Sequence, residues 1–131
     1  IDVQLSLDMK VRYPVANNIL EETVGQAAIE RGPLVYCCES VDTHAADLDD
    51  VYLDLNAEFT PVEFEIQGRR MMALETEEYA IDRSEFDRNA LYQPLKYHGM
   101  SRKHVRLIPY YAWDNRDYGE MRIWFPVAYT V

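Results

Sequence analysis

Features that mark two common functional classes are missing from this 131-residue sequence. No apolar run approaches the ~18 residues of a membrane-spanning helix, and the longest uncharged run, Ile123–Val131, contains Pro126. Basic residues are few: 13 Lys and Arg stand against 23 Asp and Glu, which gives a net charge of −10. Because that charge repels phosphate groups, we expect neither a nucleic-acid nor a membrane partner.

Cysteine is scarce, and its two copies, Cys37 and Cys38, are adjacent. A trans peptide holds adjacent Cα atoms about 3.8 Å apart, which is shorter than most disulfides require. No neighbouring residue supplies the cation or helix N-terminus that lowers a thiol pKa. A thiolate nucleophile and a pair of metal ligands are the functional alternatives. We predict two free thiols, one facing a core and one facing outward, without a catalytic role.

Motifs for metal, phosphate and nucleophilic chemistry are also absent. The histidines His44, His98 and His104 lack zinc-ligand spacing, and there is no Gly-rich phosphate loop or recognisable Ser-His-Asp pattern. The acidic run 47–54 lacks the glycine and closing glutamate of an EF-hand loop. The acidic clusters 47–50 and 75–78 are interpreted as solvated faces or weak cation sites. We predict no cofactor, no metal and no catalytic residue.

The sequence does contain enough apolar material for one folded core. Hydrophobic residues make up 48% of it and aromatic residues 12%, which excludes intrinsic disorder. A chain of this length suits a single domain. Residues 39–88 carry 15 acids and four bases, a net of −11, and the remainder carries eight acids and nine bases. The basic stretch 96–106 is expected either to attract the acidic segment within the fold or to form a separate surface face.

Strand signals recur along the chain without a convincing amphipathic helix. Strict alternation of apolar and polar residues predicts a strand over 1–11, and shorter strands are predicted at the segments 26–30, 34–39, 51–55, 62–66, 71–75, 105–113 and 121–125. The pattern predicts an all-β fold, an antiparallel β-sandwich that is jelly-roll-like, with a single domain and one long irregular loop over 76–103.

Turn residues predict where the chain reverses or bends. Arg31-Gly32-Pro33 is interpreted as a bulge or a corner at which a strand changes sheets. Gln67-Gly68 is expected to open a hairpin turn, and Gly119 is expected to supply a positive φ between the last two strands. Residues 41–50 are predicted to form a loop or a short helical turn.

An aromatic group near the C-terminal end is the strongest candidate binding surface. It comprises Tyr110, Tyr111, Trp113 and Trp124, and Asn115 lies beside it. Exposed rings on a sheet can stack on sugar faces while polar neighbours bond the hydroxyls. The alternative is that Tyr111 and Trp113 share one strand face and line the core or a domain interface.

Two motifs resemble a known family. Arg31-Gly32-Pro33-Leu34-Val35-Tyr36-Cys37 is followed about seventy residues later by Leu107-Ile108-Pro109-Tyr110-Tyr111-Ala112-Trp113-Asp114-Asn115-Arg116 and by Gly119-Glu120-Met121-Arg122-Ile123-Trp124. Together they are similar to the C-terminal part of glycoside hydrolase family 127, the β-L-arabinofuranosidase family, formerly a domain of unknown function. The resemblance covers nearly the whole chain, more loosely over 40–100.

The resemblance implies that catalysis lies outside this chain. Enzymes of that family place a cysteine nucleophile, its zinc cluster and a glutamate acid/base in an (α/α)6 barrel that precedes β-sandwich domains. No catalytic residue transfers to this sequence. The chain opens at Ile1 in mid-strand and without an initiator Met, so we interpret residues 1–131 as a C-terminal β-sandwich domain excised from a larger bacterial protein.

The resulting hypothesis is a non-catalytic accessory domain with the barrel of the same parent chain as its partner. The alternatives are a free-standing carbohydrate-binding module that uses the Tyr110–Trp113 face, and an enzyme in its own right. Interface or sugar contacts are assigned to the residues Arg31, Tyr36, Tyr110, Tyr111, Trp113, Asn115 and Trp124. Carbohydrate binding and a homo-oligomer stay open, as does the compartment, with cytoplasm favoured over periplasm.

Overall fold

The computed structural model describes residues 9–45, 47–87, 89–94 and 99–128, and it is all-β as the sequence predicts. The strands are β1 (Val11–Arg12), β2 (Gln26–Ala27), β3 (Ile29–Arg31), β4 (Leu34–Glu39), β5 (Val51–Asp54), β6 (Thr60–Ile66), β7 (Arg69–Ile81), β8 (Met100–Pro109), β9 (Met121–Arg122) and β10 (Phe125–Ala128). Short 3₁₀ turns are η1 (Glu21–Thr23), η2 (Ser40–Asp42), η3 (Leu48–Asp50) and η4 (Tyr110–Ala112). Residues 1–8 of the predicted strand over 1–11 lie outside the described residues; Met9 and Lys10 are not in a strand, and Val11 begins β1. No helix in the described part of the chain is long and apolar enough to cross a membrane.

The strands form one curled sheet in the order β1-β3-β4-β8-β7-β5-β10-β2, with β6 added on β7 and β9 on β4. The curl follows from β2 and β3, which lie near opposite ends of this order although only Ala28 separates them in sequence. The backbone N–H of Ala28 donates to the carbonyl of Pro14 at 3.0 Å. The chain therefore bends from one end of the sheet to the other at Ala28, and not at Gly32-Pro33 as predicted.

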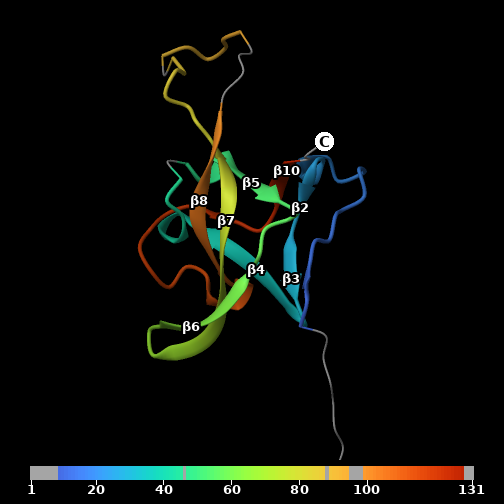
Figure 1. Cartoon of the computed structure of the whole chain (residues 1–131), viewed down its shortest axis with the longest axis vertical. Helices are drawn as coiled ribbons and strands as arrows, with labels where there is room; N and C mark the ends of the chain where they lie inside the picture. The colour runs from blue at the N-terminus through green and yellow to red at the C-terminus, as the bar shows by residue number, and fades with distance from the viewer. Residues whose placement is uncertain (1–8, 46, 88, 95–98, 129–131) are drawn as a thin grey trace, which may run out of the picture.

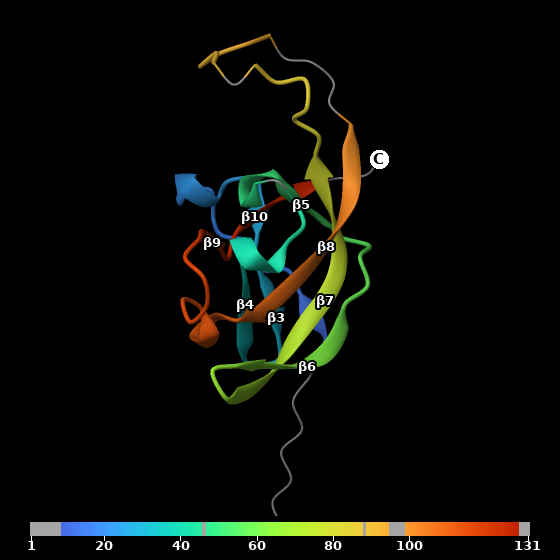
Figure 2. The same ribbon diagram turned by 90° about the vertical axis from the view of Figure 1, so that its left-hand side faces the viewer.

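Pairing is antiparallel throughout the described strands except between β5 and β10, where Val127 lies opposite Leu53 in a parallel pair. Strand β8 first runs along β7, from Met100 to Leu107, and then pairs with Cys37 and Tyr36 of β4 through Ile108 and Pro109. Figure 2 shows the resulting diagonal crossing of β7 and β8 over β3 and β4. The sheet is thus mixed and strongly curled.

Gly32 and Pro33 form a two-residue hairpin turn between β3 and β4, with Arg31 opposite Leu34. Gly32 has φ +57°, and proline holds φ near −65°, which is the pattern of a type II′ turn. The guanidinium of Arg12 donates to the Gly32 carbonyl at 2.7 Å. The motif is therefore a tight turn closed by β1 and not a bulge.

Strands β7 and β8 extend further than predicted. Their register runs from Leu74 opposite Leu107 to Ile81 opposite Met100, so both strands extend into the segment 76–103 that the sequence predicts to be an irregular loop. The described residues 82–87 and 89–94 project from the body beyond the ends of the two strands (Figure 1). Glu78 faces inward at an apolar position and is 1% exposed, which hides the alternation of β7 in the sequence.

Two clusters of buried side chains lie on opposite faces of β4. The larger cluster contains Cys38 together with Tyr36, Leu74 and Phe125, and the smaller contains Cys37 with residues of β6, β7 and η4. Both cysteines are 0% exposed and free. The prediction of two unbridged thiols is confirmed, but the expectation that one faces outward is wrong because the second cluster covers that face.

Candidate functional site

The predicted aromatic group lies on a turn and not on a strand. Strand β8 ends at Pro109, and Tyr110, Tyr111 and Trp113 follow in and after η4 with exposed fractions of 45%, 59% and 39%. The interpretation that Tyr111 and Trp113 line the core from one strand face is therefore wrong. Their rings stand available to a ligand or a neighbouring domain.

Arg31 and Tyr36 are brought together beside this turn. Tyr36 is 0% exposed, and its hydroxyl donates to the Met72 carbonyl at 3.0 Å. Burial raises the pKa of the Tyr36 phenol, the neighbouring Arg31 guanidinium opposes that shift, and Tyr111 adds to it. The side chains of Arg31, Tyr36 and Tyr111 therefore lie close together. Full burial leaves Tyr36 no surface for sugar, so its role is packing.

A walled pocket opens between η4 and the turn that joins β6 to β7. We call it the η4 pocket; its volume is about 260 Å³, and its lining residues are Ile66, Gln67, Arg69, Met71, Tyr111, Ala112 and Asn115. The side-chain amide of Gln67 donates to the Asn115 carbonyl at 3.0 Å and so joins the two walls. In Figure 2 the β6–β7 turn lies just below η4. Of the predicted residues, Tyr111 and Asn115 line the pocket, and Tyr110, Trp113 and Trp124 do not.

Gln67 and Arg69 are the lining residues that sequence reasoning did not single out for function. The sequence marks 67–70 as a hairpin turn, and a turn motif carries no information about what lies opposite it. The available signal was Gln67 itself, a long amide side chain before Gly68 at a position where Asn or Asp is usual. Its reach is what allows it to contact Asn115.

The second wall of the η4 pocket is anchored by Arg116. Its guanidinium donates to Asp42 at 2.6 and 2.7 Å and to Glu39 at 2.6 Å, and the Asp114 N–H donates to Glu39 at 3.2 Å. Burial disfavours the charged guanidinium, but the hydrogen bonds to Asp42 and Glu39 outweigh it and raise the pKa of Arg116. These bonds fix the loop after η4 to η2. The side chain of Arg116 serves the fold and is not free for sugar hydroxyls.

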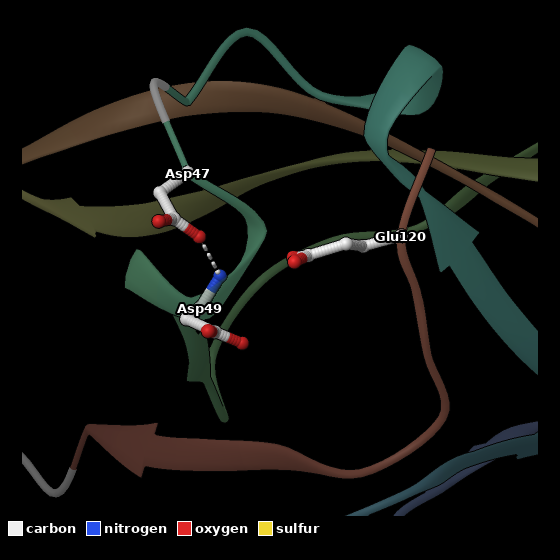
Figure 3. Close-up of side chains that lie close together, drawn as sticks. All are labelled: Asp47, Asp49 and Glu120. Atoms are coloured by element: carbon white, nitrogen blue, oxygen red, sulfur yellow. Dashed lines mark hydrogen bonds between the residues drawn. The ribbon is translucent and has the colours of Figure 1, made fainter. Parts of the chain in front are cut away.

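A second group of polar residues lies near Trp124. Asp47, Asp49 and Glu120 are exposed, and their carboxylates lie within 4.8 Å of one another (Figure 3). Asp47 accepts the N–H of Asp49 at 2.9 Å, and Arg122 pairs with Asp49 at 2.5 Å. The group of three carboxylates is therefore already paired with a cation, the guanidinium of Arg122. Trp124 is half-buried in an open groove with Glu120 and Arg122 and is separate from the η4 pocket.

His44 and His104 approach each other but form no metal-type cluster with other residues in the described part of the chain. Their ring centroids are 5.7 Å apart, and His104 Nε2 lies 2.7 Å from the Glu75 carboxylate. Hydrogen bonds from His104 and Arg106 lower the pKa of Glu75. His98 lies outside the described residues.

Neither cysteine is poised for chemistry. Burial, followed by the nearby Glu39 and Asp42 carboxylates, raises the pKa of the Cys37 thiol to about 12. Burial likewise raises the pKa of Cys38 well above its ordinary value. A thiol with such a pKa is protonated at neutral pH and is a poor nucleophile and metal ligand.

The described residues therefore form a small all-β fold with one curled sheet, two buried apolar clusters and the walled η4 pocket. The chain belongs to glycoside hydrolase family 127: residues 11–126 match the model described as the glycoside hydrolase family 127 C-terminal domain. The resemblance drawn from the Arg31–Cys37 and Leu107–Trp124 motifs is confirmed.

Known relatives are much longer than this chain. It is 33% identical over 129 residues to the non-reducing end β-L-arabinofuranosidase of Bifidobacterium longum subsp. longum, covering 94% of this chain and 19% of that protein. A solved glycoside hydrolase matches with a TM-score of 0.83 and 36% identity over 93% of this chain and 20% of its own. The family 127 β-L-arabinofuranosidase of Geobacillus stearothermophilus T6 matches with a TM-score of 0.79 and 29% identity over 92% and 18%. The chain therefore spans about a fifth of the length of these relatives.

Proposed function

We propose that this chain is a non-catalytic accessory domain of a β-L-arabinofuranosidase-type glycoside hydrolase and packs beside the catalytic barrel of the same protein. One observation carries the proposal: the chain corresponds to the C-terminal domain of family 127 and spans about a fifth of the relatives' length. The inert thiols support it, because the family's nucleophile is a cysteine and neither Cys37 nor Cys38 is exposed.

The segment before β2 supplies a surface suited to such packing. Four large apolar side chains within ten residues are exposed there: Val15 by 69%, Ile19 by 83%, Leu20 by 56% and Val24 by 54%. Several large apolar side chains exposed along one short segment suit an interface with another domain. A neighbouring domain of the same protein is the occupant that the relatives' length favours.

Activity of the chain alone is the first test. We expect no hydrolysis of an activated β-L-arabinofuranoside above the buffer rate. Turnover that is lost in Cys37→Ala would show that the chain is itself the enzyme and would overturn the proposal.

The interface is tested in the longer protein that contains this chain. Ile19→Lys should lower the melting temperature of the longer protein and leave that of the 131-residue chain unchanged, because the side chain is buried only by the neighbouring domain. Val41→Lys is the matched control, since Val41 is 49% exposed on a different segment. Equal effects of the two variants on the longer protein would contradict packing through residues 15–24, and dimerisation of the short chain lost in Ile19→Lys would identify a homo-oligomer contact instead.

Direct binding of carbohydrate is a second candidate function. The exposure of Tyr110, Tyr111 and Trp113 favours it, since exposed aromatic rings offer flat surfaces on which sugars can stack. It is compatible with the accessory role because binding sugar requires no catalytic group.

A further inference from the structure

We propose that the η4 pocket binds one pentofuranose residue, the non-reducing-end sugar of an arabinose-containing glycan. The choice of sugar rests on the proposed function; the choice of site rests on the shape and chemistry of the pocket. The proposal assigns binding to a cavity and not to the protruding aromatic face that the sequence suggests.

The size of the pocket suits a monosaccharide. A volume of about 260 Å³ corresponds to roughly nine water molecules at ~30 Å³ each. A pentose has about ten non-hydrogen atoms and is smaller than the drug-sized ligands whose pockets measure about 300–1,000 Å³. The pocket is also more enclosed than the groove that runs beside Asp54, Glu75 and Arg102.

The lining matches the mixed surface of a furanose. Ile66, Met71 and Ala112 belong to the smaller apolar cluster and form a floor for C–H groups, and the Tyr111 ring forms a wall. Arg69 stands at the rim, exposed, and makes no ion pair with any residue that the structure describes. Its fork of N–H donors can bond two neighbouring hydroxyl oxygens at once.

Charge distinguishes this pocket from the other hollows of an acidic protein. Its lining contains no Asp or Glu, although the chain carries 23 of them. The grooves near Trp124 and near Glu75 both include carboxylates. Amide groups and one guanidinium therefore face the ligand, which suits a neutral polyol and does not suit a metal ion.

The backbone on both walls adopts an uncommon conformation. Gln67 has φ +50° and Asp114 has φ +66°, and they are the non-glycine residues with positive φ among the described part of the chain. At Gln67 the positive φ belongs to the two-residue turn between Ile66 and Arg69. The Gln67–Asn115 hydrogen bond and the Arg116 anchor hold the two walls in place. The pocket is thus pre-formed, which reduces the entropy lost on binding.

The test is an NMR titration of the ¹⁵N-labelled 131-residue chain with methyl β-L-arabinofuranoside, which is locked as a furanose. We expect saturable shifts at amides of residues 66–71 and 111–116 with a Kd of roughly 1 mM or weaker. Tyr111→Ala and Arg69→Ala should each weaken binding at least tenfold. Tyr110→Ala, the neighbouring exposed tyrosine outside the pocket, should change the Kd less than twofold.

Three results would overturn the proposal: no saturable shift, an equal response to glycerol at the same concentration, or a loss in Tyr110→Ala that equals the loss in Tyr111→Ala. The last of these would assign binding to the protruding aromatic face. The titration needs no neighbouring domain, so its failure is distinguishable from failure of the Ile19→Lys experiment, which tests packing and involves no sugar.

Discussion

Glu78 shows at the scale of one residue how an apolar position can be occupied by a carboxyl group. Its side chain is 1% exposed, Oε2 accepts the N–H of Asp54 at 2.7 Å, and Oε1 has no hydrogen-bond partner. Burial raises the pKa of Glu78 from 4.5 to about 8, and the charge of Asp54 adds to the shift. The sequence places Glu78 on a solvated face, which is wrong for this member of the 75–78 run.

The raised pKa predicts that the protein loses stability as pH rises from about 4.5 to about 8. In that window the unfolded chain has released the Glu78 proton and the folded chain still holds it, so deprotonation favours unfolding. Glu78→Gln removes this dependence. We expect its free energy of unfolding, relative to wild type, to increase by at least about 1 kcal/mol between pH 5 and pH 8 in chemical denaturation.

The exposed neighbour Glu77 supplies the control for that measurement. Glu77→Gln should follow the wild-type pH dependence. If Glu78→Gln followed it as well, Glu78 would be ionised in the folded protein at pH 5 and the burial argument would fail.

The β3–β4 turn is the clearest case at the scale of an element. Gly32 holds φ +57°, a region from which a β-branched side chain is nearly excluded. Gly32→Val should therefore lower the free energy of unfolding by about 1 kcal/mol or more, measured by the denaturation midpoint. Gly99→Ala is the control, since an added Cβ there meets nothing within 4 Å. Equal midpoints for Gly32→Val and wild type would contradict a structural role for the turn.

Elements with local signals were predictable, and those set by distant contacts were not. Alternation and flanking turn residues predict β4 and β6 closely. The segment 41–50, predicted to be a loop or a short helical turn, contains η3 and all of η2 except its first residue, Ser40. The end of β7 is hidden by Glu78, and β8 stops at Pro109 before the aromatics that appeared to continue it. The parallel pair of β5 and β10 has no local signature. Gly119 is expected from the sequence to supply a positive φ. Instead it lies so close to Ser40 that a Cβ added at Gly119 would be 3.0 Å from the Cβ of Ser40.

The candidate site was predictable in part for the same reason. Tyr111 and Asn115 could be predicted as candidate binding residues because both lie within the aromatic motif. The opposite wall of the η4 pocket could not, because it comes from a turn more than forty residues away in the sequence. The Arg31 motif and the Leu107–Trp124 segment are neighbours through the strand that follows the Arg31 motif, since β4 pairs with both β8 and β9. Arg31 itself lies against Tyr36, at the end of β4 away from β9.

At the scale of the whole molecule, ion pairs join the acidic middle of the chain to its C-terminal part. All ion pairs among the described residues except Arg83–Asp50 join a carboxylate of 39–88 to a basic residue beyond 100. Of the two expectations for the uneven charge, attraction within the fold is the one realised. The same middle segment contributes to both apolar clusters, which β4 separates. These contacts should make the two clusters unfold together.

Cys37 and Cys38 report on the two clusters separately, one thiol in each. The unfolded, unreduced chain should titrate two thiols. In the native chain both should label only through global unfolding, because each is fully buried and the pKa of each is raised. Labelling rates of the single-thiol variants Cys37→Ala and Cys38→Ala, measured against denaturant concentration, should give the same opening free energy relative to each variant's own global stability.

A rate for Cys37 that does not depend on denaturant would reveal local opening of the smaller cluster, in which η4 and the β6–β7 hairpin separate while the larger cluster stays intact. That result would also mean that the η4 pocket is not held rigid by the fold, since Ile66, Met71 and Ala112 form both its floor and the cover over Cys37.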